Sequence, residues 1–287
     1  MTSPPANASL HAKRGPFAVV PLLTAVVFIL AALNPAHSAA AQDSRSRTAK
    51  PVIVLVHGAW ADASSWSRVV ARLQDDGYTV RAIANPLRSL SGDAASVKAF
   101  LKTLTGPIVL VGHSYGGAVI TNAATGNPNI KALVYVNAFA PDAGESATSL
   151  AGPDSALSAP DPTTVFDLVP DTLPPTADTE LYLKDSTVFT SFANGLSADE
   201  KAIVAASQRS ATVGALNEPS GTPAWRTIPS WNLIGTKDRI IPQSAQRAMA
   251  ERAGSTIIEY DAGHVGLMTD PTTVTRVIER AARATVH

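Results

Sequence analysis

The chain of 287 residues contains no cysteine. This absence excludes disulfide bonds, thiolate nucleophiles and metal or cluster sites built from cysteine. Lysine and arginine together number 23, and so do aspartate and glutamate, which gives no formal net charge at pH 7. Because no strongly basic run is present either, we expect neither nucleic acid nor an anionic membrane as a partner. A small, uncharged or weakly charged molecule is expected instead.

Motifs for metal and cofactor chemistry are also missing. The sequence has no H-E-x-x-H, no P-loop and no G-x-G-x-x-G. These are the patterns of zinc proteases, nucleotide phosphate binding and dinucleotide binding, respectively. We therefore expect chemistry that requires no metal and no organic cofactor.

The N-terminal region has the composition of an export signal. A positive region at residues 13–14 precedes an uncharged apolar stretch over residues 17–33, and small residues at 39–41 offer a cleavage site. We predict a cleaved signal peptide over residues 1–41 and a flexible lead-in over residues 42–50. The alternative is an uncleaved anchor, because the apolar stretch approaches the ~20 residues that span a bilayer. After cleavage the protein is expected to be secreted or periplasmic, without stable membrane association.

From residue 51 onward, short apolar runs alternate with helix-like segments. This alternation is typical of a mostly parallel sheet with helices on both faces. The predicted strands cover residues 52–56, 79–83, 108–111, 132–136, 230–234 and 256–260. The predicted helices cover residues 65–76, 94–103, 115–124, 244–253 and 272–284. Together they form one predicted domain over residues 51–287.

The alternation breaks between about residues 141 and 229. Proline is frequent there, and the apolar residues show no strand pattern. Large side chains such as Phe166, Phe192 and Trp225 argue against a solvated surface loop. Because long insertions in compact domains are usually lids or binding segments, we predict a cap over the carboxyl ends of the strands.

A nucleophile motif follows the third predicted strand. Residues 112–116 read Gly-His-Ser-Tyr-Gly and fit G-x-S-x-G, in which a strained turn between a strand and a helix exposes a serine. Glycines flanking Ser114 remove the Cβ groups that would clash in such a turn. The N-terminus of the following helix points at the reacting oxygen. A serine is a weak nucleophile without a base, so a histidine is also required.

His264 is the predicted base. Of the six histidines, two lie in the predicted signal peptide and one ends the chain. His113 adjoins the serine, and the turn directs its side chain elsewhere. His57 follows a buried strand and is better suited to ordering a loop. His264 follows the last predicted strand and precedes the last helix, which places it at the carboxyl edge of the sheet.

Asp238 is the predicted acid that orients this imidazole. It also follows a predicted strand, and the order Ser114, Asp238, His264 is the order Ser, Asp, His. Asp142 is the alternative acid, because it too leaves the sheet at a carboxyl end. Asp261 is close in sequence to the histidine and is predicted to be a turn residue.

Acyl transfer also requires two hydrogen-bond donors directed at the developing oxyanion. The backbone N–H of Tyr115, directly after the serine, is one predicted donor. The loop after the first strand supplies the other, which we assign to the backbone N–H of Ala59. Gly58 would allow that loop to approach closely.

At these residues the sequence resembles the serine α/β-hydrolases, over essentially all of residues 51–287. The likeness is closest to the small-esterase branch of plant methylesterases, hydroxynitrile lyases and bacterial relatives. The stretches that carry it are VLVHGAW, VGHSYGG, VNAFAPDAGES, GTKDRIIP and DAGHVGLMTDP. The resemblance implies an α/β-hydrolase fold with an inserted cap. It also implies the same site residues, Ser114, Asp238, His264, Ala59 and Tyr115.

One departure from the branch bears on the reaction. The hydroxynitrile lyases of this branch are similar to one another in having a lysine directly after the catalytic histidine, and its charge assists the departure of cyanide. This chain has Val265 at that position. Hydrolysis of carboxylic esters through an acyl-enzyme is therefore favoured, and apolar residues of the cap predict small hydrophobic substrates. A non-hydrolytic reaction on the same triad and a non-catalytic ligand-binding role stay open as alternatives.

Overall fold

The computed structural model describes residues 50–285. The predicted signal peptide over residues 1–41 and nearly all of the lead-in lie outside the described residues. Among the helices of residues 50–285, none is both long and apolar enough to cross a membrane.

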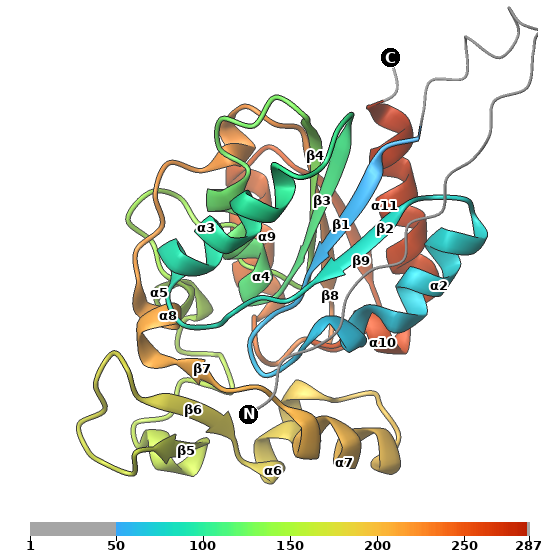
Figure 1. Cartoon of the computed structure of the whole chain (residues 1–287). Coiled ribbons are helices and arrows are strands. Elements are labelled where there is room, and N and C mark those ends of the chain that lie inside the picture. The colour runs from blue at the N-terminus through green and yellow to red at the C-terminus, as the bar shows by residue number, and fades with distance from the viewer. Residues whose placement is uncertain (1–49, 286–287) are drawn as a thin grey trace, which may run out of the picture. The chain divides into compact units, whose positions relative to one another are not determined.

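A six-stranded sheet forms the centre of the described chain (Figure 1). Its strands are β1 (Val52–Val56), β2 (Val80–Ile83), β3 (Ile108–His113), β4 (Ile130–Val136), β8 (Ser230–Gly235) and β9 (Thr256–Tyr260). They are arranged in the order β2-β1-β3-β4-β8-β9, and every neighbouring pair is parallel. Because β2 and β3 lie on opposite sides of β1, the strand order reverses there. Sheets of this kind bind ligands at the carboxyl edge beside such a reversal.

Helices cover both faces of this sheet (Figure 1). One face carries α2 (Ser67–Asp75) and α11 (Pro271–Ala284), and the other carries α3 (Leu90–Leu101), α4 (Tyr115–Ala123) and α9 (Gln243–Arg252). The short helices η1 (Ala63–Trp66) and α10 (Gly266–Thr269) precede α2 and α11. Every residue of β3 and β8 is buried, as expected for strands covered on both sides. The predicted mostly parallel sheet with helices on both faces is confirmed.

The chain between β4 and β8 forms the cap. It contains a three-stranded antiparallel sheet of β5 (Phe166–Val169), β6 (Glu180–Leu183) and β7 (Ala211–Thr212). Its helices are α5 (Ala147–Ala151), α6 (Asp185–Thr187), α7 (Ala198–Ser207) and α8 (Val213–Asn217), with the shorter turns η2 (Pro162–Thr164), η3 (Val188–Phe192) and η4 (Ala224–Arg226). The expectation that this segment has no strand pattern was wrong, because β5 alternates buried and exposed residues over four positions.

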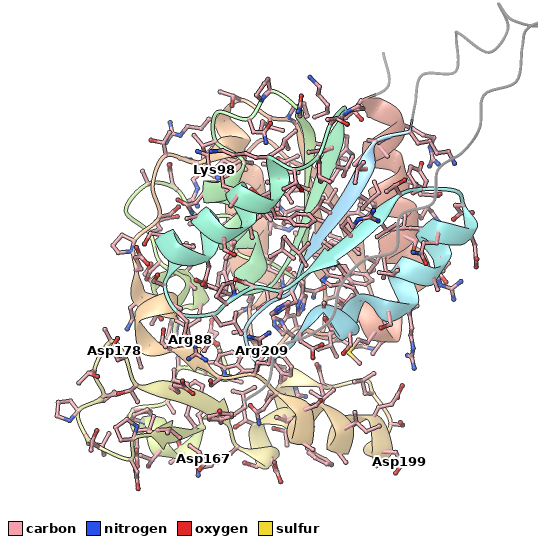
Figure 2. The ribbon with its side chains drawn as sticks, viewed as in Figure 1. Arg88, Lys98, Asp167, Asp178, Asp199 and Arg209 are labelled. Carbon is pink, nitrogen blue, oxygen red and sulfur yellow. The ribbon has the colours of Figure 1, made fainter. Side chains whose placement is uncertain are left out.

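The cap is joined to the main sheet by apolar packing and hydrogen bonds. Buried residues of β5 and β6 belong to the same hydrophobic core as the central strands. Arg88, labelled in Figure 2 where the cap meets the main sheet, forms an ion pair of 2.7 Å with Glu180 of β6. The backbone N–H of Thr212 in β7 donates to the carbonyl of Leu87 (3.1 Å). These contacts fix the cap over the carboxyl edge of the sheet.

Candidate active site

Ser114 lies at the turn between β3 and α4 and has an unusual backbone conformation. Its φ of 53° and ψ of −126° lie outside the regions that side chains other than glycine commonly adopt. The turn is tight, since a Cβ on Gly112 would lie 2.5 Å from the carbonyl oxygen of Gly116. A Cβ on Gly116 would lie 2.5 Å from the carbonyl oxygen of Val56 in β1. Only glycine fits at both positions, as the motif predicts.

Ser114, His264 and Asp238 are joined by hydrogen bonds. The Nε2 atom of His264 lies 3.0 Å from the Oγ atom of Ser114. Its Nδ1 atom lies 2.9 Å from Oδ2 and 3.1 Å from Oδ1 of Asp238. All three residues are buried. This geometry fits an imidazole that donates from Nδ1 to the carboxylate and accepts the serine hydroxyl at Nε2.

Further donors fix the orientation of the Asp238 carboxylate. Its Oδ1 atom accepts the backbone N–H groups of Ile240 (2.8 Å) and Ile241 (3.0 Å). Its Oδ2 atom accepts from Nδ2 of Asn137 (3.1 Å) and Nε2 of Gln246 (3.0 Å). Sequence reasoning missed both amides. Asn137 could have been noticed in the sequence, because it is a polar residue directly after the apolar end of a strand.

The alternative acids are engaged elsewhere. Asp142 forms an ion pair of 2.6 Å with Arg226, and this hydrogen-bonded guanidinium lowers the pKa of the carboxyl. Asp261 is largely exposed and pairs with Lys237 at 2.8 Å. His264 therefore has Asp238 as its carboxylate partner within residues 50–285.

Two further histidines, His57 and His113, form hydrogen bonds with the backbone around the site. The Nε2 atom of His57 accepts the backbone N–H of Asn85 (2.9 Å), and its Nδ1 atom donates to the carbonyl of Gly58 (2.9 Å). His113 donates from Nε2 to the carbonyl of His264 (2.9 Å). Burial lowers the pKa of both imidazoles, which favours their neutral forms. These contacts match the loop-ordering role expected for His57 and the expected orientation of His113 away from the serine.

The two expected oxyanion donors line the same cavity as Ser114. Tyr115 is the first residue of α4, so its backbone N–H has no acceptor within the helix. Gly58 allows the Ala59 loop to approach, since a Cβ there would lie 2.6 Å from the Cβ atom of Ser114. The Tyr115 hydroxyl donates to Oδ2 of buried Asp93 (2.9 Å), a contact that sequence reasoning also missed. Burial raises the pKa of this carboxyl.

A cavity of about 220 Å³ adjoins Ser114. Most of its lining is apolar and comes from both the cap and the main domain, and no charged side chain of the described residues contributes to it. The cap acids labelled in Figure 2, Asp167, Asp178 and Asp199, are exposed at the outer edge of the cap. Such a cavity favours neutral apolar groups, because an unpaired charge would lose its hydration there. In the described chain, no three potential ligand side chains are placed to hold a metal ion.

Comparison with known proteins identifies the family of this chain. A sequence profile of the Alpha/beta hydrolase family matches residues 53–277. The chain is 34% identical over 110 residues to a carbendazim hydrolyzing esterase of Nocardioides sp. (strain SG-4G). The aligned residues make up 34% of this chain and 46% of that protein. This alignment thus spans about half the length of that relative. Identity to Alpha/beta hydrolase nvfD of Aspergillus novofumigatus (strain IBT 16806) is 26% over 265 residues, or 81% of this chain and 97% of that one.

A solved structure shows the same fold. It is an extracellular alpha/beta-hydrolase from a Paenibacillus species, described as sharing structural and functional homology with tobacco salicylic acid binding protein 2. The TM-score is 0.68 at 24% identity, over 81% of this chain and 99% of that chain. The predicted α/β-hydrolase fold is confirmed by this likeness and by the sheet order. Since the family profile spans nearly the whole described chain, the protein belongs to the alpha/beta hydrolase family.

Proposed function

We propose that this protein hydrolyses carboxylic esters through an acyl-enzyme on Ser114. The observation that carries the proposal is the buried chain of hydrogen bonds from Ser114 through His264 to Asp238, beside an uncharged cavity. A serine, a base and an orienting acid in this arrangement form an activated nucleophile. The esterase among the relatives supports the same class of reaction.

The proposed reaction has two halves. Ser114 Oγ attacks the ester carbonyl carbon while His264 Nε2 takes the hydroxyl proton, and Asp238 stabilises the imidazolium. The backbone N–H groups of Ala59 and Tyr115 stabilise the oxyanion. His264 then returns the proton to the departing alcohol. Water, deprotonated by His264, attacks the carbonyl carbon of the acyl-enzyme. The bond from that carbon to Ser114 Oγ then breaks, His264 returns the proton to Ser114 Oγ, and the acid is released.

The proposed substrates are small neutral esters with an apolar group. The cavity has a volume of about 220 Å³, which is smaller than the ~300–1,000 Å³ of typical drug-sized sites. Because the part of the chain that the structure describes places no charged side chain in the lining, ionised substrates are disfavoured. Val265, directly after the base, is buried and apolar, so no charge at this position would assist the departure of cyanide. A lyase would release a carbonyl product without acid.

The test is hydrolysis of p-nitrophenyl butanoate by the wild type and by Ser114→Ala. Triad members act as a unit, so the variant is expected to lose about three to six powers of ten in kcat. Circular dichroism controls for folding. Retention of a tenth or more of the wild-type kcat would exclude Ser114 as the nucleophile.

We also propose that the protein is exported and that the signal peptide ends at Ala41. The proposal rests on the charge and apolar pattern of the N-terminal sequence. N-terminal sequencing of the protein from the medium or periplasm should begin at Gln42. An intact N-terminus in a membrane fraction would favour the uncleaved anchor.

A further inference from the structure

Trp60 follows the expected oxyanion donor Ala59 and has a strained backbone. Its φ of 58° lies in the left-handed region, which large side chains rarely adopt. The residue is buried, and its indole N–H donates to the carbonyl of Leu181 in cap strand β6 (2.9 Å). Strain of this kind persists where surrounding contacts enforce it, and it is concentrated at functional sites. The cap therefore holds this indole in place despite the strained backbone.

The indole stands between two cavities. The cavity beside Ser114 measures about 220 Å³, and a second cavity, of about 80 Å³, is lined by Phe192, Val204 and other mostly apolar side chains. Among residues 50–285, Trp60 is the one residue that lines both of them. Its ring stacks on Phe166 of the larger cavity (centroid distance 5.7 Å) and meets Phe192 of the smaller one edge to face (6.1 Å). The indole is thus a partition held by the cap.

We infer that Trp60 determines substrate specificity by limiting the length of the apolar group that the site accepts. The inference rests on the proposed ester hydrolysis and identifies the favoured class as neutral esters with a short apolar chain. A chain that extends past the space beside Ser114 meets the indole. Removal of the partition would join the two cavities and bury further methylene groups, each worth about fourfold in kcat/KM.

The main test is Trp60→Leu. Leucine is suitable because Leu87 of this chain is already buried at a φ of 64°. The kcat/KM values are measured against chain length for p-nitrophenyl esters of linear acids and for acetates of linear alcohols. In one of the two series the optimum should move to longer chains by at least two carbons, with a relative gain of about tenfold or more. Unchanged optima in both series would overturn the inference.

Val204 offers a matched control, since it lines the smaller cavity and not the larger one. Adding Val204→Phe to Trp60→Leu should refill the opened space and restore the wild-type optimum. Val204→Phe alone should leave the wild-type optimum in place. If the double variant kept the preference for longer chains, the smaller cavity would not be the space that Trp60 closes. Should Trp60→Leu fail to fold, Trp60→Phe is measured instead, with a shift of about one carbon expected.

A binding experiment separates this inference from the proposed function. Alkyl phenyl ketones of graded length are titrated calorimetrically into Ser114→Ala and into Ser114→Ala/Trp60→Leu. Tighter binding of longer ketones by the second variant supports the partition, whether or not the wild type hydrolyses esters. Equal length dependence in both variants contradicts the partition, and absence of ester hydrolysis by the wild type contradicts only the proposed function.

Discussion

Asp238 and Asp142 both follow strands of the main sheet, and their surroundings separate their roles. Asp238 is buried and hydrogen-bonded to His264, and backbone and amide donors hold its two oxygens. Asp142 instead forms an ion pair with Arg226, whose side chain is more than half exposed. A carboxylate serves as the acid of such a triad by fixing the tautomer of the imidazole and stabilising its charged form. Asp238 meets that requirement.

Asp238→Asn is expected to lower kcat for ester hydrolysis by about four powers of ten, because an amide at this position stabilises the wrong imidazole tautomer. Asp142→Asn is the matched control and should change kcat by less than about twofold, since exposed ion pairs contribute little. Both are measured by steady-state kinetics with p-nitrophenyl butanoate. A large loss of kcat in Asp142→Asn combined with a small loss in Asp238→Asn would show that Asp142, and not Asp238, is the acid of the triad.

The sequence motifs predict Ser114, His264 and Asp238 because each follows a recognisable strand at the carboxyl edge. The supporting residues could not be predicted in the same way. Asn137 contacts Asp238, 101 positions later, and Asp93 contacts Tyr115, 22 positions later. Neighbouring residues in the sequence do not specify either of these contacts. The partition formed by Trp60 also depends on cap residues more than a hundred positions away. Such roles emerge only from the tertiary structure.

At the scale of elements, the turn between β3 and α4 depends on how closely β1 approaches it. A Cβ on Gly116 would lie 2.5 Å from the carbonyl oxygen of Val56 and 2.7 Å from that of His57. Both atoms belong to the backbone of the central sheet or the loop directly after it, so neither can move away easily. The glycine therefore sets the distance between the nucleophile turn and the Ala59 loop.

Gly116→Ala is expected to lower the free energy of unfolding by about 1–3 kcal/mol, because overpacking forces backbone shifts. It should also reduce kcat by at least about tenfold by displacing the serine and the oxyanion donors. Gly221→Ala is the control, since its Cβ would meet only the Oδ1 atom of Asn122 at 3.3 Å. Urea unfolding and ester kinetics measure both effects. Equal stability and activity in the two variants would contradict the close packing at this turn.

The strands of the main sheet were predictable, whereas the strands of the cap were not. The four central strands β1, β3, β4 and β8 are mostly buried runs of five to seven residues that alternate with helices, and their order along the chain specifies a parallel sheet. The cap strands have four residues or fewer. A strand of two residues, such as β7, shows no periodicity, and its pairing with β6 is decided by tertiary packing.

At the scale of the whole molecule, buried neutral histidines link stability to pH. Burial lowers the pKa of His57 and of His113 in the folded state. In the unfolded chain both imidazoles take up protons near pH ~6.5. Below that pH the unfolded state binds more protons than the folded state. Stability from these groups is therefore fully present above pH ~6.5 and is lost as the pH falls.

The free energy of unfolding should decrease between pH 7.5 and pH 5.5 by up to about 1.4 kcal/mol per pH unit for each histidine that stays neutral. Urea unfolding at several pH values measures this slope. Asp93, whose pKa is raised by burial, acts in the opposite direction at lower pH. His113→Leu isolates one contribution and should give a shallower slope than the wild type. An identical slope in both proteins would show that the pKa of His113 does not differ between the folded and unfolded states, which would contradict the effect of burial.

The most direct test of Ser114 as the nucleophile is covalent labelling of the purified protein with a fluorophosphonate, followed by mass-spectrometric mapping of the modified residue. An activated serine forms a stable phosphonyl adduct, so we expect one adduct on Ser114 in the wild type and none in Ser114→Ala. Labelling at another residue, or an equal extent of labelling in both proteins, would contradict the assignment of Ser114 as the nucleophile.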